Sequence, residues 1–211
     1  MPVDIMKAYP AIALLELNNI ADGIRVGDGM AKKAPIQVLR SGTVSHGKFL
    51  VLVGGTVASV EEAFQEGVRL AGTALLDCLD LPDVHHRVVE VLLGHSIPVS
   101  EEAVGILETP SIATTVEAAD VAIKGAQVEI LSLRLGDGFG GKGYVLFNGR
   151  VEDVQAAIEL ACALANRKNV TACTQIIPRI HEGMARQIDA GLRFAQAPET
   201  QLPDGESDVT G

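Results

Sequence analysis

The feature of this sequence that most constrains its fold is an internal repeat. When residues 11–39 are set over 103–131, the same amino acids recur at a constant offset. Two extra residues then enter the second copy, and the register resumes with 47–63 over 141–157. About nineteen identical pairs fall in some sixty positions, which is too many for chance at a fixed register. Each copy spans about ninety residues, the size of a domain rather than of a solenoid unit.

Both copies show the same order of apolar strands and amphipathic helices. In the second copy, Ser111 is the expected N-cap of the first helix. A glycine-rich loop separates the second strand from the third, and Asp153 is expected near the start of the second helix. The elements of this copy are expected at 103–108 (strand), 112–126 (helix), 128–135 and 144–148 (strands), with a fourth strand that runs into PRIH at 178–181.

The first copy repeats this order. Ser59 and Glu62 form a capping box that predicts the start of its second helix, whereas Gly23, Gly27 and Gly29 weaken its first helix. The order βαββαβ with a helical extension predicts an α+β fold of two tandem ferredoxin-like domains. The strands of the first copy are expected at 11–17, 36–40 and 49–53, and directly before PDVH at 82–85.

The glycine-rich loop 136–143 matches two nucleotide-binding patterns. GDGFGGKG satisfies G-x-G-x-x-G and lacks only a final Ser or Thr of G-x-x-x-x-G-K-[ST]. Both patterns need a helix directly after the glycines, because the free N–H groups of a helix N-terminus hold the phosphate. The apolar run YVLFN follows instead, so we expect a loop between two strands and no nucleotide site.

Composition and charge exclude several classes of partner. A formal net charge of −10 argues against binding of nucleic acid through the bulk surface. No apolar run approaches the roughly 18 residues of a membrane-spanning helix, and the first residues show no signal-peptide pattern. An odd number of cysteines (Cys78, Cys162 and Cys173) without C-x-x-C fits a reducing cytosol. We therefore expect a cytoplasmic protein with no nucleic-acid or membrane partner.

No catalytic or metal-binding constellation can be singled out. Glu16 and Glu108 recur at the ends of the first strands, where each is expected to accept hydrogen bonds from the backbone or a loop. His85 and His181 recur at matching places and are interpreted as structural residues, because no Cys or carboxylate spacing accompanies them. We expect no enzymatic activity, no cofactor and no metal.

Three separated motifs carry a family resemblance. They are E-T-x-S-I-A-x-x-x-E-A-A-D-x-A-x-K-x-A at 108–126, G-K-G-Y-V-L-F-N-G-x-V-x-D-V at 141–154, and I-I-P-R-I-H at 176–181. In this order they resemble the bacterial microcompartment (BMC) shell domain, and both copies of the repeat show the likeness. The chain thus resembles the tandem-domain class (BMC-T), whose trimers form pseudohexamers that tile a protein shell.

The resemblance implies a domain organisation and a function. It implies a structural shell protein that forms a homotrimer, assembles with other shell proteins in the cytoplasm, and passes small metabolites through a central pore. The expected parts are an N-terminal extension (1–10), a first BMC domain (11–98), a second BMC domain (99–195) and an acidic C-terminal tail (196–211).

In this family the loop between the second and third strands lines the central pore. The resemblance therefore places Ser45 and His46 of the first copy at the pore, with Gly138, Phe139 and Gly140 of the second. Three His46 side chains near one axis would form a pH-sensitive ring; the alternative is a solvated loop residue that points away. Phe139 is expected to fold back as a plug or to pack against a neighbouring chain.

Some relatives hold an iron–sulfur cluster on the threefold axis through a pore cysteine. The matching position here is Ser45, and none of the three cysteines lies in either loop, so no cluster is expected. The first alternative is an electron-transfer shell component whose metal centre uses a serine or histidine ligand. A second alternative is a ferredoxin-like regulatory domain pair that binds a small ligand at the glycine loops.

The resemblance also assigns residues to the edge of the tile. Lys32 and Lys124 match the edge lysine of the family, and Arg179 matches its edge arginine. Asp83 replaces this arginine in the first copy, and because an aspartate cannot make the hydrogen bonds of a guanidinium, alternate edges are expected to differ. The alternative for the lysines is an ordinary solvated position near a helix end.

Overall fold

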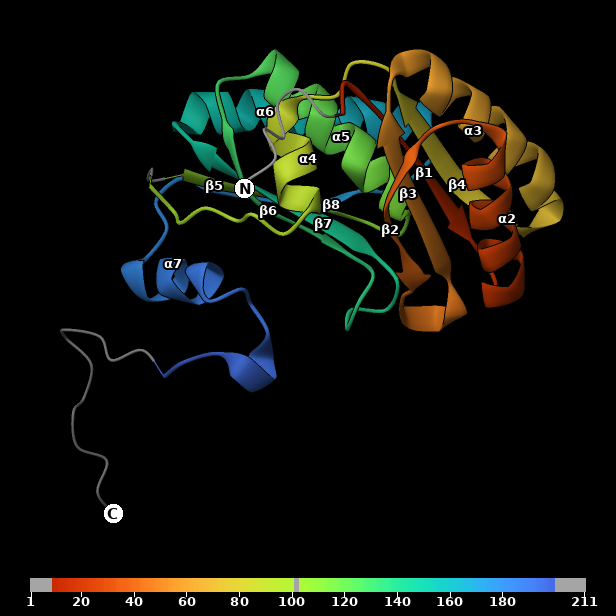
Figure 1. Cartoon of the computed structure of the whole chain (residues 1–211). Helices are drawn as coiled ribbons and strands as arrows, with labels where there is room; N and C mark the ends of the chain where they lie inside the picture. Colours follow the sequence, from red (N-terminus) through yellow and green to blue (C-terminus); the bar gives the residue numbers. More distant parts are fainter. Residues whose placement is uncertain (1–8, 101–102, 200–211) are drawn as a thin grey trace, which may run out of the picture.

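The computed structural model describes residues 9–100 and 103–199. Two four-stranded antiparallel sheets lie side by side, and helices pack against each of them (Figure 1). The strand orders are β2-β3-β1-β4 and β6-β7-β5-β8, so the second sheet repeats the first. The predicted α+β fold of two tandem ferredoxin-like domains is confirmed.

The two domains are built from corresponding elements. The first contains β1 (Ala11–Leu17), α2 (Ile20–Lys33), β2 (Gln37–Thr43), β3 (Phe49–Gly55), α3 (Val57–Ala71), β4 (Leu75–Leu81) and α4 (His86–Leu92). The second contains β5 (Ala103–Thr109), α5 (Ile112–Gly125), β6 (Glu129–Leu135), β7 (Gly143–Gly149), α6 (Val151–Arg167), β8 (Cys173–Ile177) and α7 (Glu182–Asp189). Short 3-10 turns lie at Ser45–Gly47, Gly72–Ala74 and Phe194–Gln196.

The central strands β1 and β5 hold each sheet together. β1 pairs with β3 on one side and β4 on the other, and all seven of its residues are buried. At the end of this strand Glu16 lies opposite Leu50 and Asp77, and Glu108 of β5 lies opposite Tyr144 and Cys173. This shared register identifies which positions of the two domains correspond.

The N-cap of α5 is the residue expected from the sequence, whereas the N-caps of α3 and α6 are other residues. Ser111 is the N-cap of α5, as predicted, and its hydroxyl accepts a hydrogen bond from the amide of Thr114. The second helices begin two residues before the predicted Ser59 and Asp153, at Val57 and Val151, so neither residue is the N-cap. Thr56 caps α3 and accepts a hydrogen bond from the Ser59 amide, while Asp153 lies in the first turn of α6 and pairs with Arg150 at 2.9 Å.

The glycines of α2 do not prevent a helix, because two of them fill tight packing positions. A Cβ at Gly23 would lie 2.4 Å from the ring of Phe49, and one at Gly29 would lie 2.2 Å from Leu70 Cδ1. Close packing against β3 and α3 therefore compensates for the low helix propensity of these residues. No helix in the described part of the chain is long and apolar enough to cross a membrane.

Two glycines of α2 give a matched test of this packing. Gly23→Ala is expected to lower the free energy of unfolding by about 1–3 kcal/mol, because the Phe49 ring must shift. Gly27→Ala is the control, since its Cβ would make an ordinary 3.6 Å contact with Val51 and alanine favours the helix by up to about 1 kcal/mol. Urea unfolding of both variants measures the difference, and equal stabilities would contradict the packing explanation.

Candidate pore and assembly site

The junction between the two domains is centred on Glu16. The Glu16 side chain is 1% exposed, and its Oε2 accepts hydrogen bonds from the amides of Ile112 at 2.8 Å and Ala113 at 3.4 Å. Both amides belong to the first turn of α5, where free N–H groups and the helix dipole favour a negative charge. The expectation that this carboxylate accepts backbone hydrogen bonds is confirmed, and the bonds cross between domains.

Lys48 completes the charge balance of this buried carboxylate. Its Nζ lies 2.6 Å from Glu16 Oε1 and also donates to the carbonyls of Pro110 at 3.2 Å and Gly141 at 2.9 Å. These three acceptors match the three donors of an ammonium group. Glu16 of β1 and Lys48, which directly precedes β3, therefore join the first domain to two segments of the second.

A second polar cluster lies beside Glu16 at the same junction. Asp77 of β4 accepts hydrogen bonds from the hydroxyls of Ser111 and Thr114, the latter at 2.7 Å. Lys168 Nζ lies 3.1 Å from Asp77 Oδ1 and 2.9 Å from Glu117 Oε2. Burial alone would raise the pKa of Asp77, but the two hydroxyls and the Lys168 charge outweigh it and hold this pKa below its usual value.

The two predicted pore loops touch each other within one chain. The Gly138 amide donates to Ser45 Oγ at 3.1 Å, and the Ser45 amide donates to the Gly136 carbonyl at 3.3 Å. His46 has a φ of 67°, and Gly138 and Gly140 also have positive φ, which bends both loops tightly. The predicted strand after the glycine-rich loop is confirmed as β7, so no helix N-terminus follows these glycines.

Phe139 folds back onto its own chain. Its ring meets the ring of Tyr144 in an edge arrangement, with centroids 5.3 Å apart and an interplanar angle of 62°. Such a contact is favourable for two aromatic rings and fixes the tip of the loop against β7.

The two lysines assigned to the tile edge have different surroundings. Lys32 pairs with Asp28 at 2.6 Å, and both side chains are exposed. Lys124 pairs with the buried Asp120 at 2.7 Å and donates to the carbonyl of Asp83, which belongs to the first domain. Lys124 therefore bridges the two domains. It contacts Asp120, one turn earlier in α5, and the PDVH segment of the first domain.

Arg179 and the histidines of the two repeated motifs are placed as follows. Arg179 is exposed and forms no ion pair within residues 9–100 and 103–199. His85 and His181 are N-caps: their Nδ1 atoms accept hydrogen bonds from the amides of Arg87 and Gly183, at 3.2 and 3.1 Å. This confirms a structural role for both histidines.

The described residues contain no group of three or more His, Cys, Asp or Glu side chains placed to hold a metal ion.

Sequence reasoning missed the Asp77 cluster. The recurrence of Glu16 as Glu108 drew attention to the glutamates at the ends of the first strands. Asp77 gives no such signal, because Cys173 occupies the corresponding place opposite the first-strand glutamate. A polar cluster that occurs at only one of two corresponding positions cannot be found by comparing the repeats.

The Asp77 cluster makes the junction sensitive to acid. Asp77→Asn is expected to lower the free energy of unfolding at neutral pH by about 1–3 kcal/mol, because Lys168 loses a charged partner. The folded-state pKa lies below the usual value, so the carboxylate stabilises the protein above about pH 4 and loses this effect as pH falls through the folded-state pKa. Urea unfolding should therefore show a gap between the two proteins that is constant near neutrality and closes in acid. A gap that widens in acid would contradict this assignment.

Comparison with known proteins connects this geometry to a family. A family model described as the BMC domain matches the chain twice, over residues 11–83 and 103–180. The bacterial microcompartment shell protein PduT of Citrobacter freundii is 40% identical over 181 residues, which cover 86% of this chain and 98% of PduT. The shell protein PduA of the same organism is 29% identical over 93 residues, 44% of this chain and 97% of PduA.

A solved structure agrees with these matches. The crystal structure of a microcompartment protein from Desulfitobacterium hafniense is 35% identical to this chain, with a TM-score of 0.75. The match covers 83% of this chain and 98% of that chain, so both domains take part in it. These relatives are shell proteins and microcompartment proteins, and they lend no support to the electron-transfer or regulatory alternatives. The chain belongs to the bacterial microcompartment shell proteins and carries the BMC domain twice, in tandem.

Proposed function

We propose that three copies of this chain form a ring, a pseudohexameric tile of a microcompartment shell, with a central pore for small metabolites. The observation that carries the proposal is that the surface joining the two domains recurs at the outer ends of the chain, where its described residues are exposed. In a closed ring with head-to-tail contacts, the second domain of each copy meets the first domain of the next copy. The resemblance to the tandem-domain class sets the number of copies at three.

The first helices of the two domains differ in how much apolar surface they expose. Ile112 and Val116 of α5 are fully buried, and α5 packs against β4 of the first domain. Their counterparts in α2, Ile20 and Ile24, are 45% and 60% exposed. Because exposed apolar side chains that are close together mark interaction surfaces, α2 is proposed to pack against β8 of a neighbouring copy.

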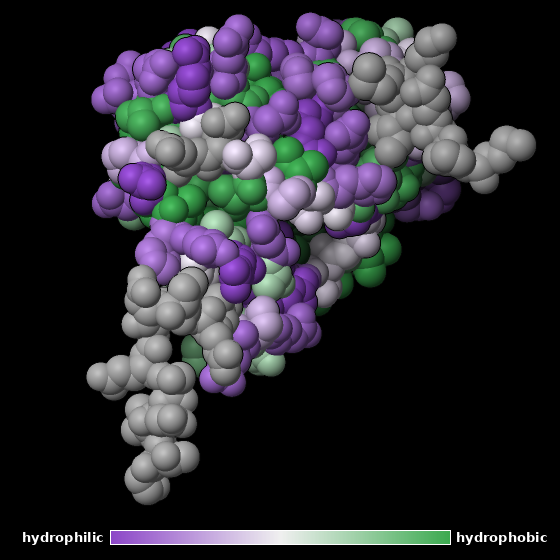
Figure 2. Space-filling view, turned by 90° about the vertical axis from the view of Figure 1, so that its left-hand side faces the viewer, coloured by the Kyte–Doolittle hydropathy of each residue, from purple (hydrophilic) through white to green (hydrophobic). Residues whose placement is uncertain are grey.

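The last helices of the two domains show the same contrast between buried and exposed apolar positions. α4 crosses the junction and packs against β6, where Val88 and Ile130 are fully buried. Met184 of α7 and Val38 of β2 hold the corresponding positions and are 53% and 47% exposed. Figure 2, which looks onto the side of the second domain and α7, shows apolar patches among polar side chains. We propose that α7 covers β2 of the next copy.

The repeated ion pair supplies the polar part of this interface. Glu108 and Lys142 lie 2.6 Å apart, as Glu16 and Lys48 do, but their side chains are 40% and 50% exposed. By correspondence with Glu16, the Glu108 carboxylate is proposed to accept hydrogen bonds from the first turn of α2 in the next copy. Lys142 would then reach backbone carbonyls of that copy, as Lys48 reaches those of the second domain.

Ring closure would bring the pore loops to one axis. Ser45 and His46 already lie beside Gly138 and Gly140, through the hydrogen bond between Ser45 and Gly138. Three such pairs of loops would alternate around the centre and present glycine backbone to passing metabolites. In this arrangement His46 and Phe139 have three copies each, so the pore is proposed to have threefold rather than sixfold chemistry.

The trimer is tested by removing the exposed copy of the junction carboxylate. Glu108→Ala is expected to weaken trimer formation at least about tenfold, because the first turn of α2 in the neighbour loses a hydrogen-bond acceptor and Lys142 loses its charged partner. Native mass spectrometry and sedimentation over a range of concentrations measure the trimer fraction. Glu159→Ala, an exposed glutamate on α6 with no described ion pair, is the control. A wild-type monomer, or a trimer unaffected by Glu108→Ala, would overturn the proposal.

The tile edge is proposed to contain Lys32, Lys124 and Arg179, which the structure leaves at the surface. Arg179→Ala is expected to abolish two-dimensional sheets seen by electron microscopy while the trimer mass stays unchanged, because the guanidinium has no described partner within the chain. Arg167→Ala removes another exposed arginine without a described ion pair and is expected to leave the sheets intact. Sheets that survive Arg179→Ala would refute the edge role of this residue.

A further inference from the structure

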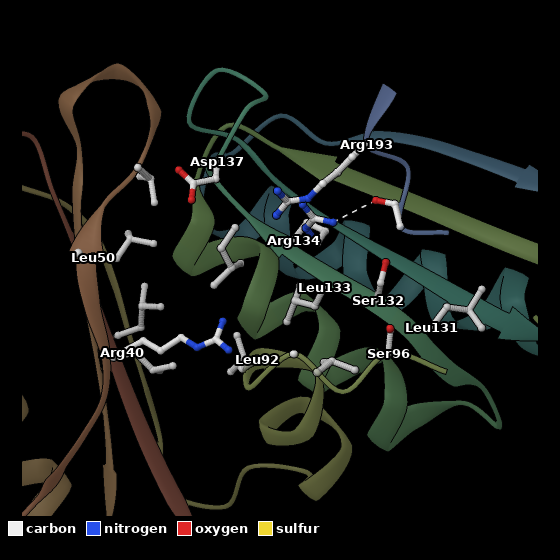
Figure 3. A pocket seen from close by; sticks show the side chains of 18 of the residues that line it. Arg40, Leu50, Leu92, Ser96, Leu131, Ser132, Leu133, Arg134, Asp137 and Arg193 are labelled. Carbon is white, nitrogen blue, oxygen red and sulfur yellow. Dashed lines mark hydrogen bonds between the residues drawn. The ribbon is translucent and has the colours of Figure 1, made fainter. Parts of the chain in front are cut away.

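A cavity of about 750 Å³ lies between the two domains. Its walls are β2 and β3 of the first domain and β6 of the second, and the segment after α7 closes one side (Figure 3). Leu50 and Leu52 line it from β3 of the first domain, and Leu92 and Leu133 belong to the same apolar wall. Small-molecule sites in proteins have cavities of roughly 300–1,000 Å³ with mostly apolar walls, so this cavity has the size and lining of a ligand site.

Three arginines from separate segments converge on this cavity. Arg40 comes from β2, Arg134 from β6, and Arg193 from the segment after α7. Figure 3 shows Arg134 and Arg193 side by side, while Arg40 points into the cavity from the opposite wall. Like charges held next to each other repel, so such a group is favoured when an anion lies between them.

None of these guanidinium groups is neutralised by a carboxylate within the described residues. Arg40 donates to the Leu93 carbonyl at 2.7 Å and Arg134 to the Gly191 carbonyl at 3.1 Å. Elsewhere in the same part of the chain, five arginines do pair with an acid: Arg25, Arg69, Arg87, Arg150 and Arg186.

The acidic residues that line the cavity do not neutralise its arginines. Asp137 and Asp189 also line it, but neither pairs with an arginine within residues 9–100 and 103–199. Asp189 instead accepts a hydrogen bond from the Val99 amide at 2.9 Å. In a chain whose net charge is −10, the cavity thus carries more arginines than acids.

We propose that this cavity binds a small organic oxyanion, a phosphate ester or carboxylate that carries a short apolar segment. The planar guanidinium groups of Arg134 and Arg193 match the oxygens of such an anion, and the leucine wall takes its apolar part. Val44 and Asp137 line the cavity next to the two pore loops, so the bound anion lies beside the proposed pore. All the residues belong to one chain, so the site is complete without a second copy.

Calorimetric titration of the full chain with phenyl phosphate, benzoate and inorganic phosphate tests the ligand class. At least one of the two aromatic anions is expected to bind saturably with a Kd of about 1 mM or tighter. Inorganic phosphate is expected to bind at least about tenfold more weakly than phenyl phosphate, because it cannot use the apolar wall. The tighter of phenyl phosphate and benzoate identifies the anionic group. Absence of saturable binding by both aromatic anions, or equal binding of the two phosphates, overturns the proposal.

Arginine variants locate the site. Arg193→Gln is the cleanest change, because this side chain has no described hydrogen bond within the protein. It and Arg40→Gln, on the opposite wall, are each expected to weaken the Kd about tenfold. Arg167→Gln removes an exposed charge that does not line the cavity and is expected to leave the Kd unchanged. The native mass of each variant is measured alongside, since a variant that keeps its trimer but loses the anion reports on the cavity alone. Unchanged affinity in both Arg193→Gln and Arg40→Gln overturns the proposal.

Discussion

One buried carboxylate sets how the two domains of this shell protein meet. Glu16 is 1% exposed, and a buried charge is tolerated only when it is both paired and hydrogen-bonded. Lys48 of the same domain supplies the countercharge, and the first turn of α5 in the other domain supplies the backbone donors. If the second domain moved away, this charge would lose two of its three described hydrogen-bond donors. The carboxylate therefore ties the end of β1 to the first turn of α5, and through Lys48 it is linked to Gly141 of the glycine-rich loop.

Much of the fold could be predicted because its signals are local or repeated. The strands and the order of the helices follow from apolar periodicity in two copies, and Ser111 caps α5 as its side chain predicts. The second helices begin earlier than predicted, since Thr56 provides a cap before Ser59 and the acid at Asp153 acts within the first turn. The domain boundaries stay predictions, and the extension and tail assigned to 1–10 and 196–211 lie mostly outside the described residues.

The candidate sites were less accessible to sequence reasoning, for a physical reason. Asp77 and Lys168 meet only because β4 and the end of α6 come together at the junction, and the repeat offers no second example. The arginine-lined cavity likewise needs β2, β6 and the segment after α7, which are far apart in the chain. The family resemblance located Ser45 and Phe139 as pore candidates, but whether they line a pore depends on contacts between copies, which one chain does not contain. Such roles remain predictions.

The junction between the two domains of one chain differs in chemistry from the proposed junctions between copies. Inside the chain, the covalent link keeps the partners close, so the junction can rely on half-buried polar groups such as Asp77 and Ser111. At the outer ends the corresponding positions are Cys173 and Asn19, while Ile24 adds exposed apolar surface. A free copy can keep such a surface in water, whereas an unpartnered buried charge would be costly. In the proposed trimer, linking two domains in one chain thus allows a polar contact at every second junction and leaves the others to apolar packing and to the solvated pair of Glu108 and Lys142.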